Sequence, residues 1–131
     1  MYSNGYNVYK NNSINYASKE QLLLMLVDGA VKFVKISRQA IVDKNVERSH
    51  TYLKKTQNII VELMVNVDLS KAPWLDHLFQ VYSYVNDKLM EVNMKKDLKL
   101  LDEIIPVIES IQKLWHDCYK KAQEERKMKE W

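Results

Sequence analysis

The chain has 131 residues, of which 47% are hydrophobic and 28% charged, and it contains only two glycines and two prolines. A chain of this length forms one domain, and so few turn-forming residues favour a small number of long helices, so we predict an all-α fold. A formal net charge of +3 is too small to indicate a nucleic-acid-binding protein, and the single cysteine, Cys118, excludes an internal disulfide.

The apolar segments are all shorter than a membrane span. Met1 is not followed by the basic and then apolar order that is typical of a signal peptide. We therefore expect a cytoplasmic protein, located in the cytosol, without membrane insertion.

Residues 1–17 are predicted to form a flexible N-terminal arm. They include five asparagines, four tyrosines and the turn-forming pair Asn4-Gly5, and they show no helical period. The first helix is predicted to begin at Ser18, because its hydroxyl can accept hydrogen bonds from the first turn while Gln21 reaches back to its backbone. We expect this helix to end near Asp43.

The next two helices are recognised by apolar residues at spacings of three and four. The second is predicted to run from Val46 to about Val67, with Asn45 as its N-terminal cap. The third begins at Pro73, which suits a first helical turn because proline lacks the N–H that is unused there. Its apolar period continues to Val92.

The last helix is predicted from Leu98 to about Lys127, with Asp97 as its cap. Pro106 lies inside it and should kink the helix rather than break it, because the apolar period continues across the proline. The links between helices are short, so sequential helices should be antiparallel. We predict an up-down four-helix bundle over residues 18–131, ending in a charged C-terminal helical extension.

The first and last predicted helices each have two apolar stripes, although a bundle helix needs only one. In the first helix the stripes are Leu22, Met25, Leu26, Gly29, Phe33, Ile36 and Ala40, and Leu23, Val27, Ala30, Val34 and Ile41. A wide core explains most of this surplus, and the alternative is a trough that binds segments of another protein. Gly29 fits either explanation, because a missing side chain allows another backbone to approach closely.

The sequence offers little for catalysis, since it has three histidines and neither a Gly-rich phosphate loop nor a serine nucleophile motif. We therefore predict no enzyme, no metal and no cofactor. Glu47 and His50 match the Glu-x-x-His of di-iron bundles, but a second copy is missing. His50 with Lys54 is loosely similar to histidine-phosphotransfer bundles, although Lys55 stands where a small residue is needed. Phosphotransfer through His50 and a generic helical interaction module remain the alternatives.

Five segments of the chain together form a more specific pattern than any one of them alone. They are Ala17-Ser18 with Gln21-Leu22 and Met25 to Ala30, Gln57 to Leu63 with Val67-Asp68, Leu78 with Val81 to Val85, Val92-Asn93 with Asp97, and Leu114-Trp115. In this order and at these spacings they resemble the flagellar export chaperones of the FliS family. The chain departs from the family pattern at Lys19, at Val27 and in the segment Lys71–Trp74, which suggests an adapted partner.

The resemblance implies a cytosolic chaperone that binds the C-terminal segment of flagellin, prevents premature polymerisation and presents it to the flagellar export apparatus. In this family the client wraps round the bundle, and the N-terminal arm covers a binding surface in the free protein. The residues expected on this basis to contact the arm or the client are Tyr6, Tyr9, Leu23, Val27, Tyr82, Tyr84 and Asn93.

Overall fold

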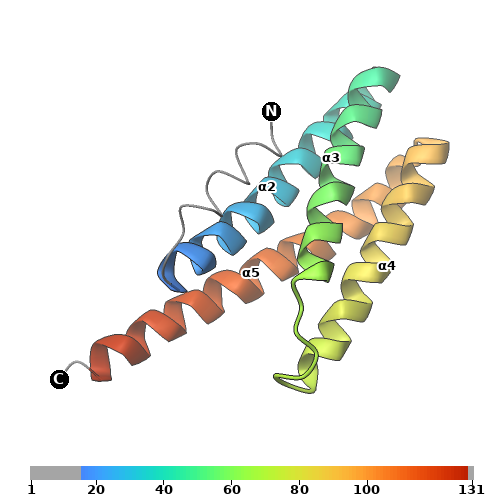
Figure 1. The fold of residues 1–131 in the computed structure, drawn as a ribbon. Helices are drawn as coiled ribbons and strands as arrows, with labels where there is room; N and C mark the ends of the chain where they lie inside the picture. Colours follow the sequence, from blue (N-terminus) through green and yellow to red (C-terminus); the bar gives the residue numbers. More distant parts are fainter. Residues whose placement is uncertain (1–15, 130–131) are drawn as a thin grey trace.

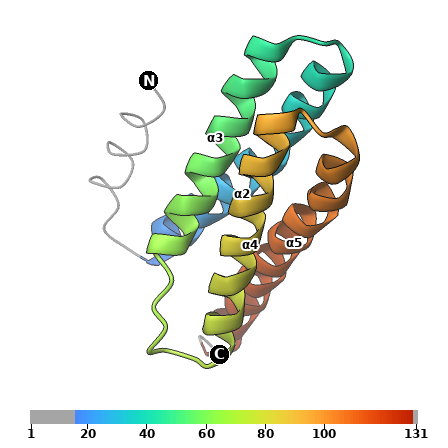
Figure 2. The same cartoon turned by 90° about the vertical axis from the view of Figure 1, so that its right-hand side faces the viewer.

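The structure is a computed structural model that describes residues 16–129, with side chains from Lys19 onward. These residues form four α-helices, α2 (Tyr16–Val42), α3 (Val46–Val65), α4 (Trp74–Lys95) and α5 (Leu98–Lys129). Sequential helices run antiparallel, and each packs against two neighbours in the cyclic order α2, α3, α4, α5 (Figures 1 and 2). The predicted all-α four-helix bundle is confirmed. The predicted arm up to residue 15 lies outside the described residues.

The two ends of the bundle differ. Figure 2 shows the long loop of residues 66–73 between α3 and α4 at one end, called the loop end below. The turns at residues 43–45 and 96–97 lie at the other end, called the turn end. α2 begins and α5 ends at the loop end, where these two helices diverge from α3 and α4 (Figure 1).

The start of the first helix was predicted wrongly. α2 begins at Tyr16, two residues before the predicted start, so the backbone of Ser18 lies within the first turn. Ala17 explains the longer helix, because alanine has the highest helix propensity of all residues. The predicted cap of the second helix is confirmed, since the side-chain oxygen of Asn45 accepts the backbone N–H of Arg48 at 3.0 Å.

The turn into the last helix follows the prediction. The Asp97 carboxylate accepts the backbone N–H of Leu100 at 3.1 Å. Lys96 adopts a left-handed conformation with φ of 51°, which reverses the chain between α4 and α5. α5 runs through Pro106 without a break, as predicted, and the hydroxyl of Ser110 donates to the Pro106 carbonyl at 2.9 Å.

The core takes up most of the apolar surplus of the first helix. Val27, Ala30 and Val34 from its second stripe are at most 1% exposed, whereas Met25 from its first stripe is 58% exposed. The fully buried positions on the other helices include Leu53, Ile60, Tyr82, Val85, Leu89, Val92 and Leu101. The wide core therefore accounts for most of the second stripe, and surface for a partner remains only at particular places.

Gly29 allows α2 and α3 to approach each other closely. A Cβ atom at Gly29 would lie 3.2 Å from Cδ1 of Ile59, which is itself 1% exposed. The space left by the missing side chain is thus filled by the bundle's own α3. Of the two explanations for this glycine, the structure supports close packing within the bundle.

Polar pairs join α2 to α5 along their length. From the loop end to the turn end they are Glu20 with Arg126, Asp28 with Gln112 and His116, Lys35 with Glu109, and Arg38 with Asp102. The Arg38 guanidinium donates to both carboxylate oxygens of Asp102, at 2.6 and 3.2 Å. These pairs, most of them exposed, contribute little free energy each, and all of them fit one antiparallel register of α2 against α5.

The carboxylate of Asp28 is the best-connected member of this series. It accepts hydrogen bonds from Gln112 at 2.9 Å and from His116 at 2.7 Å. Burial on its own would raise the pKa of Asp28, but the two hydrogen bonds and the charge of His116 outweigh it and hold the pKa below its ordinary value. The hydrogen bond from Arg38 likewise lowers the pKa of Asp102.

The contact between Gly29 and Ile59 predicts energetic coupling between these positions. Gly29→Ala improves helix propensity by about 1 kcal/mol but crowds Cδ1 of Ile59. Ile59→Val removes that atom and alone costs about 0.5–1.5 kcal/mol. In urea unfolding followed by circular dichroism, the free energy of unfolding of the double variant should exceed the value obtained by adding the two single effects by about 0.5–1 kcal/mol. Strict additivity would contradict the close packing.

The lowered pKa of Asp28 predicts a loss of stability in acid. A carboxyl whose pKa is lower in the folded state stabilises the fold above its unfolded value of 3.8, and this contribution disappears as the pH falls below it. Asp28→Asn should therefore lose less unfolding free energy than the wild type as the pH falls below 3.8. The difference should be less than about 1 kcal/mol because the pair is exposed. Asp117→Asn is the control, because Asp117 pairs with Lys113 of the same helix and does not connect α5 to α2. An identical acid limb in wild type and Asp28→Asn would contradict the assignment.

Candidate functional site

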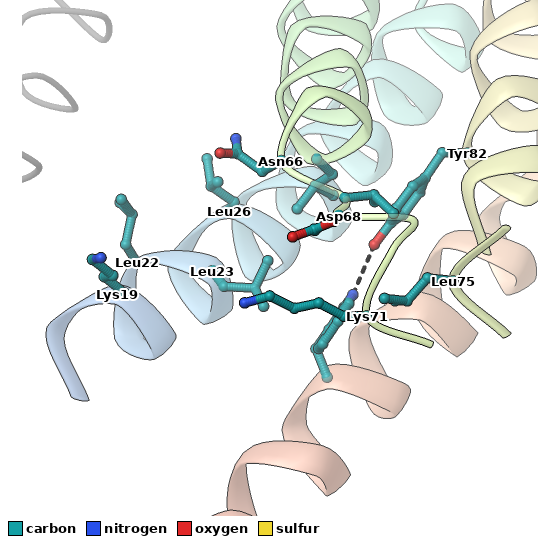
Figure 3. Close-up of a pocket in the computed structure, with 12 residues that line it drawn as sticks. Lys19, Leu22, Leu23, Leu26, Asn66, Asp68, Lys71, Leu75 and Tyr82 are labelled. Atoms are coloured by element: carbon teal, nitrogen blue, oxygen red, sulfur yellow. Dashed lines mark hydrogen bonds between the residues drawn. The ribbon is translucent and has the colours of Figure 1, made fainter. Parts of the chain in front are cut away.

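A cavity of about 460 Å³ opens at the loop end (Figure 3). All four helices and the loop between α3 and α4 contribute to it. The lining residues are Lys19, Leu22, Leu23 and Leu26 from α2, Leu63 from α3, Asn66, Val67, Asp68 and Lys71 from the loop, Leu75 and Tyr82 from α4, and Trp115 from α5. Its apolar side chains are buried or half-buried and its polar ones are exposed, so the cavity has an apolar floor and a polar rim.

Tyr82 and Trp115 form the aromatic part of the floor. The indole Nε1–H of Trp115 donates to the Tyr82 hydroxyl at 2.7 Å, the bond that is dashed in Figure 3. Burial raises the pKa of Tyr82 to about 12, although the bond from Trp115 acts in the opposite direction. Trp74 packs against Trp115 with ring centroids 6.2 Å apart and remains 48% exposed. The aromatic surface thus continues from the cavity to the outside of the bundle.

The loop at the rim has its own hydrogen bonds. The Asp68 carboxylate accepts the backbone N–H of Ser70 at 3.0 Å and its hydroxyl at 2.6 Å. These bonds, with a smaller effect of the Lys71 charge, lower the pKa of Asp68. The side chains of Lys71 and Lys19 also line the rim. The loop includes Lys71–Trp74, where the sequence departs from the family pattern.

The structure brings together two of the predicted site residues and separates the others. Leu23 and Tyr82 both line the cavity. Val27 is 1% exposed and belongs to the core. Tyr84 is 50% exposed on the outside of α4, where the ammonium of Lys88 lies 5.7 Å from its ring centroid. Tyr6 and Tyr9 lie outside the described residues.

Asn93 lies near the turn end, far along α4 from the cavity. Its side-chain Nδ2 donates to Nδ1 of His50 at 2.9 Å, and its oxygen accepts from Lys96. Asn93 thereby connects α4 to α3 and to the turn that follows. His50 is exposed, and one ring nitrogen is engaged in this bond. Residues 16–129 contain no group of three or more side chains that could hold a metal ion.

Several lining residues were not predicted as site residues from the sequence, among them Leu22, Leu63, Leu75 and Trp115. One signal was available for α2, since its apolar run from Leu22 to Val27 is longer than a single stripe requires. The inner part of this run enters the core, and the part nearest the helix start lines the cavity. No comparable signal marks the loop residues, because chain folding alone brings them to the rim.

Comparison with known proteins gives a consistent result over nearly the whole chain. The model of the family described as "Flagellar protein FliS" matches residues 2–122. The chain is 32% identical over 127 residues to a flagellar secretion chaperone FliS of Bacillus subtilis, covering 94% of this chain and 92% of the relative. It is 25% identical over 115 residues to that of Campylobacter jejuni, covering 87% and 90%, and 29% identical over 103 residues to that of Escherichia coli, covering 77% and 76%.

The raised pKa of Tyr82 predicts an alkaline transition. The neutral phenol stabilises the fold fully below pH 10, and this contribution is lost as the pH rises to about 12. Tyrosinate absorbance should therefore show a late step near pH 12 that is absent in Tyr82→Phe and present in the exposed control Tyr84→Phe. Tyr82→Phe should also destabilise the bundle by about 1–2 kcal/mol, because the Trp115 N–H loses its acceptor. A complete titration well before pH 12 in folded protein would contradict this assignment.

Proposed function

The chain belongs to the FliS family of flagellar secretion chaperones, and we propose that it binds the C-terminal segment of flagellin, prevents its premature polymerisation and aids its delivery to the flagellar export apparatus. Such a role is carried out in the cytoplasm, before export. It requires neither a cofactor nor a nucleic acid. Of the helices described here, none is long and apolar enough to cross a membrane.

The observation that carries the proposal is the cavity at the loop end. Its volume of about 460 Å³ lies in the range of sites that enclose a ligand in proteins, roughly 300–1,000 Å³. Leucines from three helices line it, so it suits apolar side chains of a bound segment. Each well-buried leucine or isoleucine of the client contributes about 1.5–3 kcal/mol before the cost of ordering.

The rim of the cavity suits the backbone of such a segment. Asn66 and Asp68 are exposed beside the apolar floor, and an amide or carboxylate there can bond to peptide groups of the client. A disordered segment that folds on this surface pays its ordering entropy on binding, so the preformed floor is an advantage. Apolar client residues that are held in the cavity are unavailable for assembly with other flagellin molecules.

The proposal predicts one-to-one binding of a flagellin C-terminal segment in calorimetry, with a negative heat-capacity change because apolar surface is buried. Leu22→Glu places a charge on the half-buried cavity wall and should weaken binding at least tenfold. Leu23→Ala removes part of the floor and should weaken it roughly fivefold to tenfold.

Met94→Glu is the matched control, because Met94 is 82% exposed at the turn end. It should bind the segment like the wild type, and circular dichroism should show all variants folded. The absence of both heat and a complex in gel filtration would refute the proposed function. Equal weakening by Leu22→Glu and Met94→Glu would place the binding surface elsewhere.

A further inference from the structure

The segment Lys71–Trp74, where the chain departs from the family pattern, forms one side of the cavity. Lys71 lines the rim. Trp74 packs on Trp115, which lines the floor, and remains half exposed. The altered residues therefore lie at the mouth of the cavity, and their chemistry indicates which group of a bound segment the cavity receives there.

The backbone on both sides of Lys71 is ordered by turns. The N–H of Lys71 donates to the Asp68 carbonyl at 3.2 Å, and the Asp68 carboxylate accepts both the backbone N–H and the hydroxyl of Ser70. After Lys71, the N–H of Leu75 donates to the Ala72 carbonyl at 3.2 Å. The loop thus presents Lys71 from an ordered backbone, and in Figure 3 its side chain extends from the loop toward α2.

The Lys71 ammonium places a positive charge above an apolar floor. The ion pairs among the described side chains do not include Lys71. The charge of Asp68 acts on Lys71, but the Asp68 carboxylate already accepts two hydrogen bonds from Ser70. A lysine ammonium has three donors and no acceptor, so the group that complements it best is a carboxylate.

The walls of the cavity favour the end of a chain over its middle. All four helices and the loop contribute lining residues, so the site is bounded on several sides. An internal stretch of chain has to enter and leave again, whereas a chain end has to enter only once. The last residue also carries its side chain and its carboxylate on one Cα atom, so that the side chain can reach the leucine floor while the carboxylate stays at the rim.

We propose that Lys71 binds the terminal carboxylate of the client segment, while an apolar side chain at the end of that segment fills the leucine floor. The inference rests on the proposed function, because it assigns the end of the bound flagellin segment to the cavity. Lys71 is then a residue that determines specificity, since it selects a segment that ends at the cavity over one that continues past it.

The test uses calorimetry with the full chain and three peptides of the flagellin C-terminal segment. One peptide ends in the natural carboxylate, one ends in an amide, and one is extended by a short glycine–serine tail. The natural peptide should bind about fivefold more tightly than the other two. This advantage should decrease as salt is added, because the ion pair lies at a rim that solvent reaches.

Two substitutions on the loop should act in opposite directions. Lys71→Met keeps the apolar stem of the side chain and removes its charge, so it should weaken binding of the natural peptide about fivefold and leave binding of the amide unchanged. Asp68→Asn removes the anion that competes for Lys71, so it should strengthen binding of the natural peptide about twofold.

Lys99→Met is the matched control, because Lys99 is exposed in the first turn of α5, at the turn end. It removes the same charge and should alter binding of the natural peptide less than about twofold. Circular dichroism should show that all three variants are folded.

Three results would overturn the inference and leave the proposed function intact. They are equal binding of the three peptides, equal effects of Lys71→Met and Lys99→Met, and equal weakening of the natural peptide and the amide by Lys71→Met. The last result would assign Lys71 to a side-chain carboxylate within the segment. If none of the peptides binds, the proposed function fails and the inference fails with it.

Discussion

The unequal length of the helices is the constraint on which the rest of the structure depends. α2 and α5 have 27 and 32 residues, whereas α3 and α4 have 20 and 22. At 1.5 Å per residue, each of the longer helices exceeds each of the shorter ones by roughly 8–18 Å. Polar pairs from Glu20 with Arg126 to Arg38 with Asp102 hold α2 and α5 in one register. The surplus length therefore collects at the loop end, where the cavity opens.

The two seams of α2 have different chemical roles. Toward α5 its charges are matched by carboxylates or by partners such as His116, which makes that seam a structural contact. Toward α3 it packs closely at Gly29, lines the cavity near its start, and leaves Arg48 and Lys55 of α3 over aromatic rings. α2 thus stabilises the bundle through its contact with α5 and lines the cavity near its start.

Sequence patterns located some of the residues that line the cavity and missed the rest. Leu23 and Tyr82 were selected by resemblance to the family, and both line the cavity. Val27 was selected in the same way but is buried in the core, because its position on α2 points toward the bundle axis. Leu22 and Trp115 were not selected, since an apolar residue on a cavity wall and one in a core have the same periodicity.

The sequence by itself determined the helices apart from the start of the first, the caps at Asn45 and Asp97, the antiparallel order and the family, because these depend on local patterns and short links. Only the tertiary structure decided how the apolar surplus divides between core and cavity. That division depends on which helix ends extend past their neighbours and on side chains far apart in sequence, such as Tyr82 and Trp115, meeting in space. Periodicity records which face of a helix is apolar, but not what covers it.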